Sequence, residues 1–221
     1  MVNTIIWDLD GTLLNTLDDL CDSVNFALTQ YSMPTRNHKD IRRFLGNGIN
    51  NLIRQSVPEG ISEEVFDNIF QTFRTYYIDH SQIKTKPYQG ILETLAVLKN
   101  AGYKMAIVSN KIQDAVTDLK NQFFSEYISV AIGESEDIRR KPEPDMVFTA
   151  IELLGSTRER TVYIGDSEVD IQTAVNSGIR CISVLWGFRD EDFLIQKGAK
   201  TFAKSPQDII ALLSQLNPSN T

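Results

Sequence analysis

From residue 88 onward, the sequence repeats one pattern: a helix-like stretch, a glycine and a short apolar run. The glycines and the runs after them are Gly102 with 104–108, Gly155 with 161–164, and Gly178 with 179–185. Glycine is favoured where a helix ends in a left-handed residue, and continuous apolar runs are typical of strands buried on both faces of a parallel sheet. The alternation therefore predicts an α/β fold with a doubly wound, Rossmann-like parallel sheet.

A helical segment interrupts this pattern near the N-terminus. Residues 4–9 read as a further strand, but residues 15–83 contain only helix-like stretches. One of these stretches, 16–31, carries a single apolar stripe and has acidic residues in its first turn. We therefore expect a small helical domain at 15–83, inserted after the first strand of an α/β core made of 1–14 and 84–221.

Charge and cysteine content argue against several kinds of partner. The chain has 29 Asp and Glu residues against 22 Lys and Arg, a net charge of −7, so it should repel the phosphate backbone of nucleic acids. Cys21 and Cys181 are far apart and outside any CxxC pattern, which argues against a disulfide framework or a zinc site. Charged residues soon interrupt the apolar run at the N-terminus, so we expect neither a signal peptide nor a membrane span. The prediction is a cytoplasmic protein that binds neither nucleic acid nor membrane.

Polar residues follow three of the strand-like runs. These segments are Asp8-Leu9-Asp10-Gly11-Thr12, Ser109-Asn110-Lys111 and Gly165-Asp166-Ser167. In open α/β sheets, ligands bind beyond the carboxyl ends of the strands. We therefore expect the three segments to face one crevice.

Carboxylates gather at this predicted crevice. Asp8 and Asp10 are two residues apart and share one face if the strand continues through them, while Asp166 and Asp170 are four apart at the start of the next helix. Two carboxylates about 5 Å apart repel by roughly 3 kcal/mol at an effective dielectric constant of about 20, so several such pairs need a counter-charge. Oxygen ligands without nearby His or Cys favour Mg²⁺. The sequence thus predicts a Mg²⁺ site.

The motifs resemble those of a known family. DLDGT from Asp8, the serine of SNK at 109–111, KP at Lys141 and GDSEVD up to Asp170 stand in the four-motif order of the haloacid dehalogenase superfamily. A helical insert after the first motif also resembles the helical cap domain of that family. The resemblance implies a Mg²⁺-dependent phosphatase that forms a covalent aspartyl-phosphate.

Roles for single residues follow from this resemblance. Asp8 resembles the nucleophile that takes up the phosphoryl group. Asp10 resembles the general acid and base, and its backbone carbonyl would also bind the metal. Lys141 would be the fixed cation that neutralises the phosphoryl group.

The resemblance also implies a set of binding residues. Those expected to bind the phosphoryl oxygens, besides Lys141, are Thr12, Ser109 and Asn110. The metal ligands expected are Asp8, Asp10, Asp166 and Asp170, with Asp170 binding directly or through water.

The substrate is predicted from two further stretches. Phe44-Leu45-Gly46-Asn47-Gly48 and Leu185-Trp186-Gly187-Phe188 resemble segments of phosphoglycolate phosphatases. Gly46, Asn47 and Gly48 before a helix could present backbone N–H groups to a second anion of the substrate. The expected substrate is a small phosphorylated metabolite such as 2-phosphoglycolate, bound by a monomer or a homodimer.

Other activities are compatible with parts of the pattern. Pyrophosphatases and sugar-phosphate phosphatases share much of it and stay open. A β-phosphoglucomutase-like phosphomutase is disfavoured because residues 15–37 contain no histidine, and Asp10 argues against a dehalogenase. A binding protein that had lost catalysis would usually lack the nucleophile or the metal carboxylates, and this chain has both.

Overall fold

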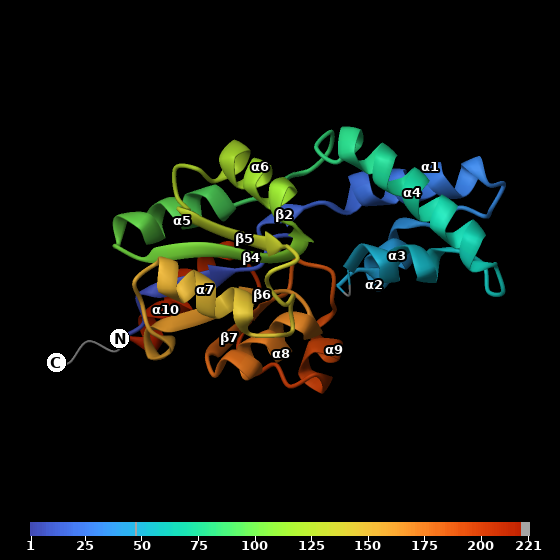
Figure 1. Cartoon of the computed structure of the whole chain (residues 1–221). Helices are drawn as coiled ribbons and strands as arrows, with labels where there is room; N and C mark the ends of the chain where they lie inside the picture. The colour runs from blue at the N-terminus through green and yellow to red at the C-terminus, as the bar shows by residue number, and fades with distance from the viewer. Residues whose placement is uncertain (47, 218–221) are drawn as a thin grey trace. The chain divides into compact units, whose positions relative to one another are not determined.

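The computed structural model describes residues 1–46 and 48–217 (Figure 1). The chain divides into two units. One consists of Met1–Leu14 together with the chain from Pro87 onward, and the other of Asn15–Lys86. The first unit contains the three polar segments that the sequence places after strands.

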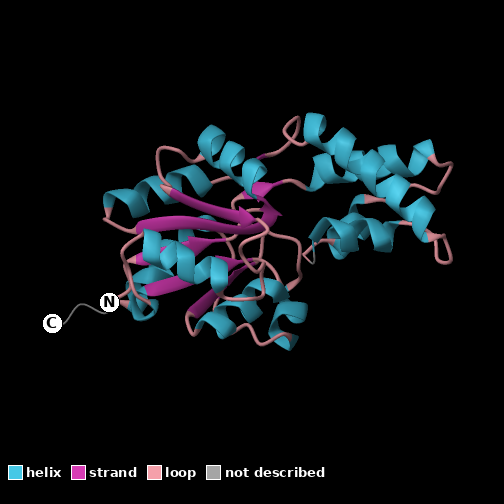
Figure 2. Cartoon of the chain, viewed as in Figure 1, coloured by secondary structure: helices cyan, strands magenta, loops and turns pink. Residues whose placement is uncertain are grey.

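A parallel sheet forms the centre of the first unit (Figure 2). Within the described residues it has six strands in the order β5-β4-β1-β6-β7-β8, and every neighbouring pair is parallel. The strands are β1 (Thr4–Trp7), β4 (Lys104–Ile112), β5 (Val130–Glu134), β6 (Thr161–Gly165), β7 (Arg180–Val184) and β8 (Phe202–Ala203). This arrangement confirms the predicted fold class. It also places β1, and so Asp8 directly after it, in the middle of the sheet.

Helices cover both faces of this sheet (Figure 1). They are α5 (Ile91–Asn100), α6 (Gln113–Phe123), α7 (Asp145–Leu153), α8 (Glu168–Ser177), α9 (Glu191–Gln196) and α10 (Pro206–Leu216), with a 3₁₀ turn η1 at Arg158–Arg160. Side chains of α5, α6 and α10 pack in one hydrophobic cluster with Trp7, and side chains of α7 and α8 pack in another with Ile6. Because successive strand residues point to opposite faces, the continuous apolar run of β1 serves both layers.

Turns between helices and strands follow the expected chemistry. Gly102, Gly155 and Gly178 have φ angles of +82°, +56° and +66°, the left-handed conformation predicted for helix ends. Two strands end more than one residue away from the predicted boundary. β1 ends at Trp7, and β4 extends through Ser109 to Ile112 with a register shift after Val108.

The second unit is helical in its described residues. Its helices are α1 (Leu17–Gln30), α2 (His38–Phe44), α3 (Gly48–Ser56) and α4 (Glu63–His80). α4 begins after Ser62, whose hydroxyl accepts the N–H of Val65. β2 (Leu14–Asn15) and β3 (Lys86–Pro87) pair as a second sheet where the chain passes between the units. No helix in the described part of the chain combines the length and the apolar character needed to cross a membrane.

Candidate active site

Asp8 lies at the carboxyl end of β1 and is 6% exposed. Its backbone N–H donates to the carbonyl of Ile164 at 2.8 Å, which ties it to β6. Its Oδ1 lies 2.6 Å from Nζ of Lys141, and its Oδ2 accepts the hydroxyl of Thr12 at 3.1 Å. Burial raises the pKa of Asp8 to about 7, although Lys141 acts in the opposite direction. The Asp8 carboxylate is therefore buried away from solvent and held in one orientation by its hydrogen bonds.

Lys141 is 5% exposed and bonds to several groups at once. Besides Asp8, its Nζ lies 2.7 Å from Oδ1 of Asp170 and 3.1 Å from the hydroxyl of Tyr163. Burial alone would lower the pKa of Lys141, but Asp170 and Asp8 outweigh burial and hold this pKa well above its ordinary value. The site thus contains a fixed positive charge.

The side chain of Asn110 fastens the Lys141 segment to β4. Its Nδ2 donates to the backbone carbonyl of Lys141 at 3.0 Å, and its Oδ1 accepts the Lys141 backbone N–H at 2.9 Å. The amide therefore positions Lys141. Its predicted contact with a phosphoryl group stays a prediction.

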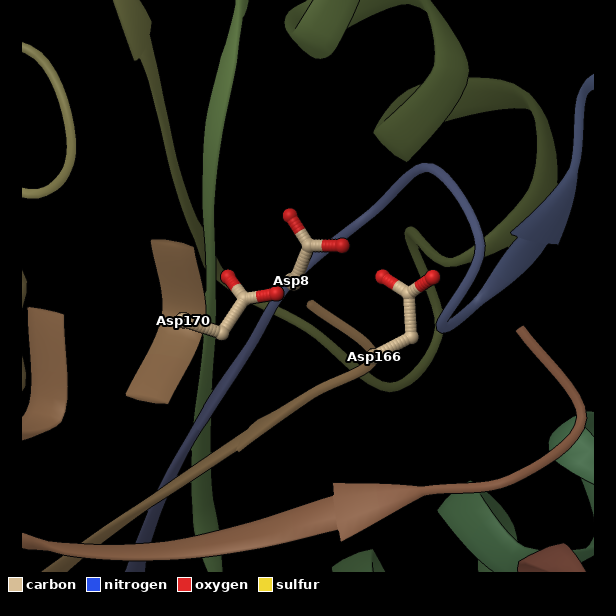
Figure 3. A group of neighbouring side chains, drawn as sticks. All are labelled: Asp8, Asp166 and Asp170. Atoms are coloured by element: carbon tan, nitrogen blue, oxygen red, sulfur yellow. The ribbon is translucent and has the colours of Figure 1, made fainter. Parts of the chain in front are cut away.

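In the described part of the chain, Asp8, Asp166 and Asp170 form a buried cluster that could hold a metal ion (Figure 3). One oxygen of each lies within 4.8 Å of the others. Burial first, and then the charges of Asp8 and Asp170, raise the pKa of Asp166 well above its ordinary value. When all three carboxylates are ionised, they outweigh the Lys141 ammonium by two negative charges, and a bound cation would favour this ionised form. This donor set suits one divalent ion that prefers oxygen ligands.

Asp170 differs from the other two carboxylates in how it is held. Its Oδ2 accepts the backbone N–H and the hydroxyl of Ser167 at 3.1 and 2.6 Å, which is the capping box of α8. Its Oδ1 faces Lys141 and the hydroxyl of Tyr163 at 3.1 Å. Each oxygen of Asp170 therefore already accepts two hydrogen bonds from the protein, whereas each oxygen of Asp8 accepts one.

Asp10 and Ser109 lie near this cluster but outside it. Oδ1 of Asp10 is 3.1 Å from Nζ of Lys111, an ion pair that the sequence did not indicate. Ser109 is 2% exposed, and its hydroxyl accepts the N–H of Lys111 at 3.2 Å. The Asp10 side chain is thus not one of the three clustered carboxylates, and the metal contact expected of its backbone carbonyl stays a prediction.

The predicted substrate loop lies in the second unit. Gly46 and Gly48 have φ angles of +107° and +82°, so both occupy the left-handed region that glycine favours. Gly48 is the first residue of α3. Asn47 lies outside the described residues.

A loop after β7 holds Asp166 and the first motif together. The N–H of Phe188 donates to Oδ2 of Asp166 at 2.6 Å, and the indole N–H of Trp186 donates to the carbonyl of Thr12 at 2.9 Å. Neither contact was predicted, because the residues involved are distant in sequence. In the sequence, Leu185–Phe188 carries only a resemblance to phosphoglycolate phosphatases.

Gly187 allows these segments to approach one another. A Cβ at this position would collide with Cβ of Asp166 and lie 2.5 Å from the carbonyl oxygen of Gly11. Gly187→Ala is expected to cost about 1–3 kcal/mol by overpacking, which lowers Tm by roughly 2–4 °C per kcal/mol in a chain of this size. It should also reduce activity by moving Asp166.

Gly102→Ala is the matched control. Gly102 has a positive φ and open space around it, so alanine strains the backbone there without touching the site. Melting curves and rates of both variants test whether Gly187 is needed for the close packing against Asp166. Equal activity of Gly187→Ala and wild type would contradict it.

Comparisons with known proteins show which family the chain resembles over most of its length. The model of the haloacid dehalogenase-like hydrolase family matches residues 5–184. A phosphoglycolate phosphatase of Mesorhizobium japonicum is 30% identical over 190 residues, covering 84% of each chain. The pyrophosphatase PpaX of Halalkalibacterium halodurans is 29% identical over 213 residues, covering 96% of this chain and 97% of its own.

A solved structure extends the comparison to the fold. A crystal structure from Lactobacillus delbrueckii subsp. bulgaricus, provisionally assigned as a phosphoglycolate phosphatase, superposes with a TM-score of 0.89 at 36% identity. The match covers 94% of this chain and 96% of the other. The resemblance predicted from the four motifs is confirmed, and the chain belongs to the haloacid dehalogenase-like hydrolase family.

Proposed function

We propose that this hydrolase is a Mg²⁺-dependent phosphomonoester phosphatase that acts through an aspartyl-phosphate on Asp8. This proposal rests on the buried Asp8 carboxylate, which lies 2.6 Å from the Lys141 ammonium and within a cluster of three carboxylates. A phosphoryl group brings negative charge to a site that already has an excess of it. A fixed ammonium and a divalent ion together would neutralise that charge.

Asp8 and Asp166 are the side chains that would hold Mg²⁺ directly, with the backbone carbonyl of Asp10. Asp170 would act through water, because each of its oxygens already accepts two protein hydrogen bonds, whereas each oxygen of Asp8 accepts one. When bound, the ion neutralises charge on the phosphoryl oxygens.

The protein residues would carry out two transfers. First, a carboxylate oxygen of Asp8 attacks phosphorus and the bond to the leaving oxygen breaks, while Asp10 donates a proton to that oxygen. Asp10 then removes a proton from water as the water attacks phosphorus, and the Asp8 carboxylate leaves. Lys141, Thr12 and Ser109 would hold the phosphoryl oxygens.

Asp10→Asn is expected to lower kcat by about 10²–10⁴-fold, because an amide can neither donate nor accept the proton. With p-nitrophenyl phosphate, whose leaving group needs no proton, the first step should survive and the second should not. Rapid mixing should then show a burst of p-nitrophenolate that matches the enzyme concentration, followed by slow turnover. An unchanged kcat would refute the role of Asp10.

Asp118→Asn is the matched control for this variant. Asp118 is exposed on α6, so losing its charge should leave both phases as in wild type. A similar loss of rate in both variants would assign the effect to net charge.

For the substrate, we propose a small phosphomonoester of the 2-phosphoglycolate type. Support comes from the relatives that carry this activity in their names, and the pyrophosphatase relatives make pyrophosphate the competing candidate. The test is kcat/KM for 2-phosphoglycolate beside pyrophosphate, glucose 6-phosphate and β-glucose 1-phosphate. A preference of about tenfold or more for one of the other three would contradict the assignment of 2-phosphoglycolate as the substrate type.

The loop at Gly46, Asn47 and Gly48 is proposed to recognise the second anion of this substrate. Asn47→Ala should change the ratio of kcat/KM values across the panel, whereas unchanged selectivity would remove the loop from the argument. A cytoplasmic location and a monomeric or homodimeric state stay predictions from the sequence.

A further inference from the structure

Tyr163 brings a hydroxyl group into the site from within the sheet. It lies on β6 and is 0% exposed, and its ring packs in the hydrophobic cluster that contains Ile6, Val108 and Met146. Its hydroxyl oxygen lies 3.1 Å from Nζ of Lys141 and 3.1 Å from Oδ1 of Asp170. A tyrosine would not need these contacts to fill the core, because phenylalanine has the same ring.

The directions of these hydrogen bonds follow from the groups involved. The Lys141 ammonium has three N–H donors and no acceptor, and the Asp170 carboxylate has acceptors only. The Tyr163 hydroxyl therefore accepts from Lys141 and donates to Asp170. The one O–H proton of Tyr163 is donated to Asp170, and a lone pair of the same oxygen accepts from the Lys141 ammonium.

Lys141 thereby has one acceptor for each of its N–H donors. These are Oδ1 of Asp8 at 2.6 Å, Oδ1 of Asp170 at 2.7 Å and the hydroxyl of Tyr163 at 3.1 Å. Three contacts fix the position of the ammonium at the end of the flexible Lys141 side chain. Two contacts would fix it less well.

We infer that Tyr163 is a positioning residue for phosphoryl transfer: its hydroxyl, with Asp170, holds the Lys141 ammonium against Asp8. The inference rests on the proposed function. When Asp8 takes up the phosphoryl group, its carboxylate becomes an acyl phosphate and loses its own negative charge, so it attracts Lys141 less strongly. Asp170 and Tyr163 are unchanged by the transfer, so they keep the ammonium in place through both steps.

Tyr163→Phe tests this role because it removes the hydroxyl and keeps the ring, whose centroid lies 5.7 Å from Nζ of Lys141. A displaced catalytic charge lowers the rate of the chemical step. We expect kcat for p-nitrophenyl phosphate to fall about tenfold, with KM and the Mg²⁺ concentration for half-maximal rate each changed less than about twofold.

Tyr103→Phe is the matched control. The Tyr103 hydroxyl accepts a hydrogen bond from Asn217, and Tyr103 stands just before the start of β4, whereas Ser109 lies toward the carboxyl end of that strand. Loss of the Tyr103 hydroxyl should therefore leave kcat unchanged. Melting curves of both variants, measured beside the rates, show whether each is folded at the assay temperature.

Two results would overturn the inference. A folded Tyr163→Phe with wild-type kcat and a lowered Tm would make Tyr163 a structural residue only. A kcat restored to the wild-type value by added Mg²⁺ would mean that Tyr163 acts through Asp170 on the metal instead of through Lys141. Failure of the proposed function is a distinct result, because the wild-type protein itself would then show no phosphatase activity.

Discussion

Asp8→Asn is expected to abolish turnover, with a loss in kcat of at least about 10⁴-fold. The amide nitrogen is not a nucleophile, so no acyl phosphate can form, while the shape of the side chain is kept. Thr12 and Lys141 lie next to the Asp8 carboxylate at 3.1 and 2.6 Å, and Lys141 keeps its contacts with Asp170 and Tyr163 when the charge is lost. The fold should therefore persist.

Steady-state rates and melting curves of this variant make the test. Binding of inorganic phosphate as a competitive ligand should also persist, because only one negative charge is removed from the site. If a folded Asp8→Asn protein kept more than a few per cent of wild-type kcat, the covalent mechanism would be wrong.

Removal of divalent ions is expected to have an effect of similar size. EDTA should stop turnover and excess Mg²⁺ should restore it, because without a cation the cluster of Asp8, Asp166 and Asp170 repels a phosphoryl group. Ca²⁺ should inhibit, since it accepts more ligands and could engage both oxygens of Asp8. Full activity in EDTA, or equal activity with Ca²⁺, would contradict the metal assignment.

Asp166→Asn separates metal binding from the loop contact. Asparagine keeps an oxygen that can accept the Phe188 N–H but loses the negative charge. We expect the Mg²⁺ concentration for half-maximal rate to rise at least about 100-fold, or activity to stop.

Thermal stability gives a second measurement of the same change. Burial and the like charges of Asp8 and Asp170 raise the pKa of Asp166, so its ionised form opposes folding near neutral pH. The metal-free Asp166→Asn protein should therefore melt higher than metal-free wild type. Added Mg²⁺ should raise the Tm of wild type more than that of the variant, because binding to the native state stabilises it.

Local chemistry made much of the fold predictable. Glycine after a helix followed by an apolar run located β6 and β7, and the acidic pairs marked the ends of β1 and β6. The short strand β8 (Phe202–Ala203) and the edge strand β5 (Val130–Glu134) have weak patterns and were not predicted. A two-residue strand has too few side chains to show a period.

The sequence predicted the charged residues of the site but not the residues that hydrogen-bond to them. Asp8, Lys141, Asp166 and Asp170 follow from motifs, but the hydroxyl of Tyr163 lies inside an apolar strand where an aromatic residue reads as core. Its partners come from the segment before α7 and from α8, and the pairing of Asn110 with the Lys141 backbone depends on how two distant segments meet. Tertiary contacts of this kind leave no period in the sequence.

Trapping the acyl phosphate tests the covalent mechanism most directly. Asp10→Asn protein, mixed with Mg²⁺ and p-nitrophenyl phosphate and quenched with borohydride, should contain homoserine at position 8, because borohydride reduces an acyl phosphate and leaves a free carboxylate intact. Tryptic cleavage places Asp8 in the peptide 1–36, where mass spectrometry locates the change. Samples without substrate, and the Asp8→Asn protein, should show none. Reduction at another carboxylate, or none at position 8 in a protein that shows the p-nitrophenolate burst, would contradict Asp8 as the nucleophile.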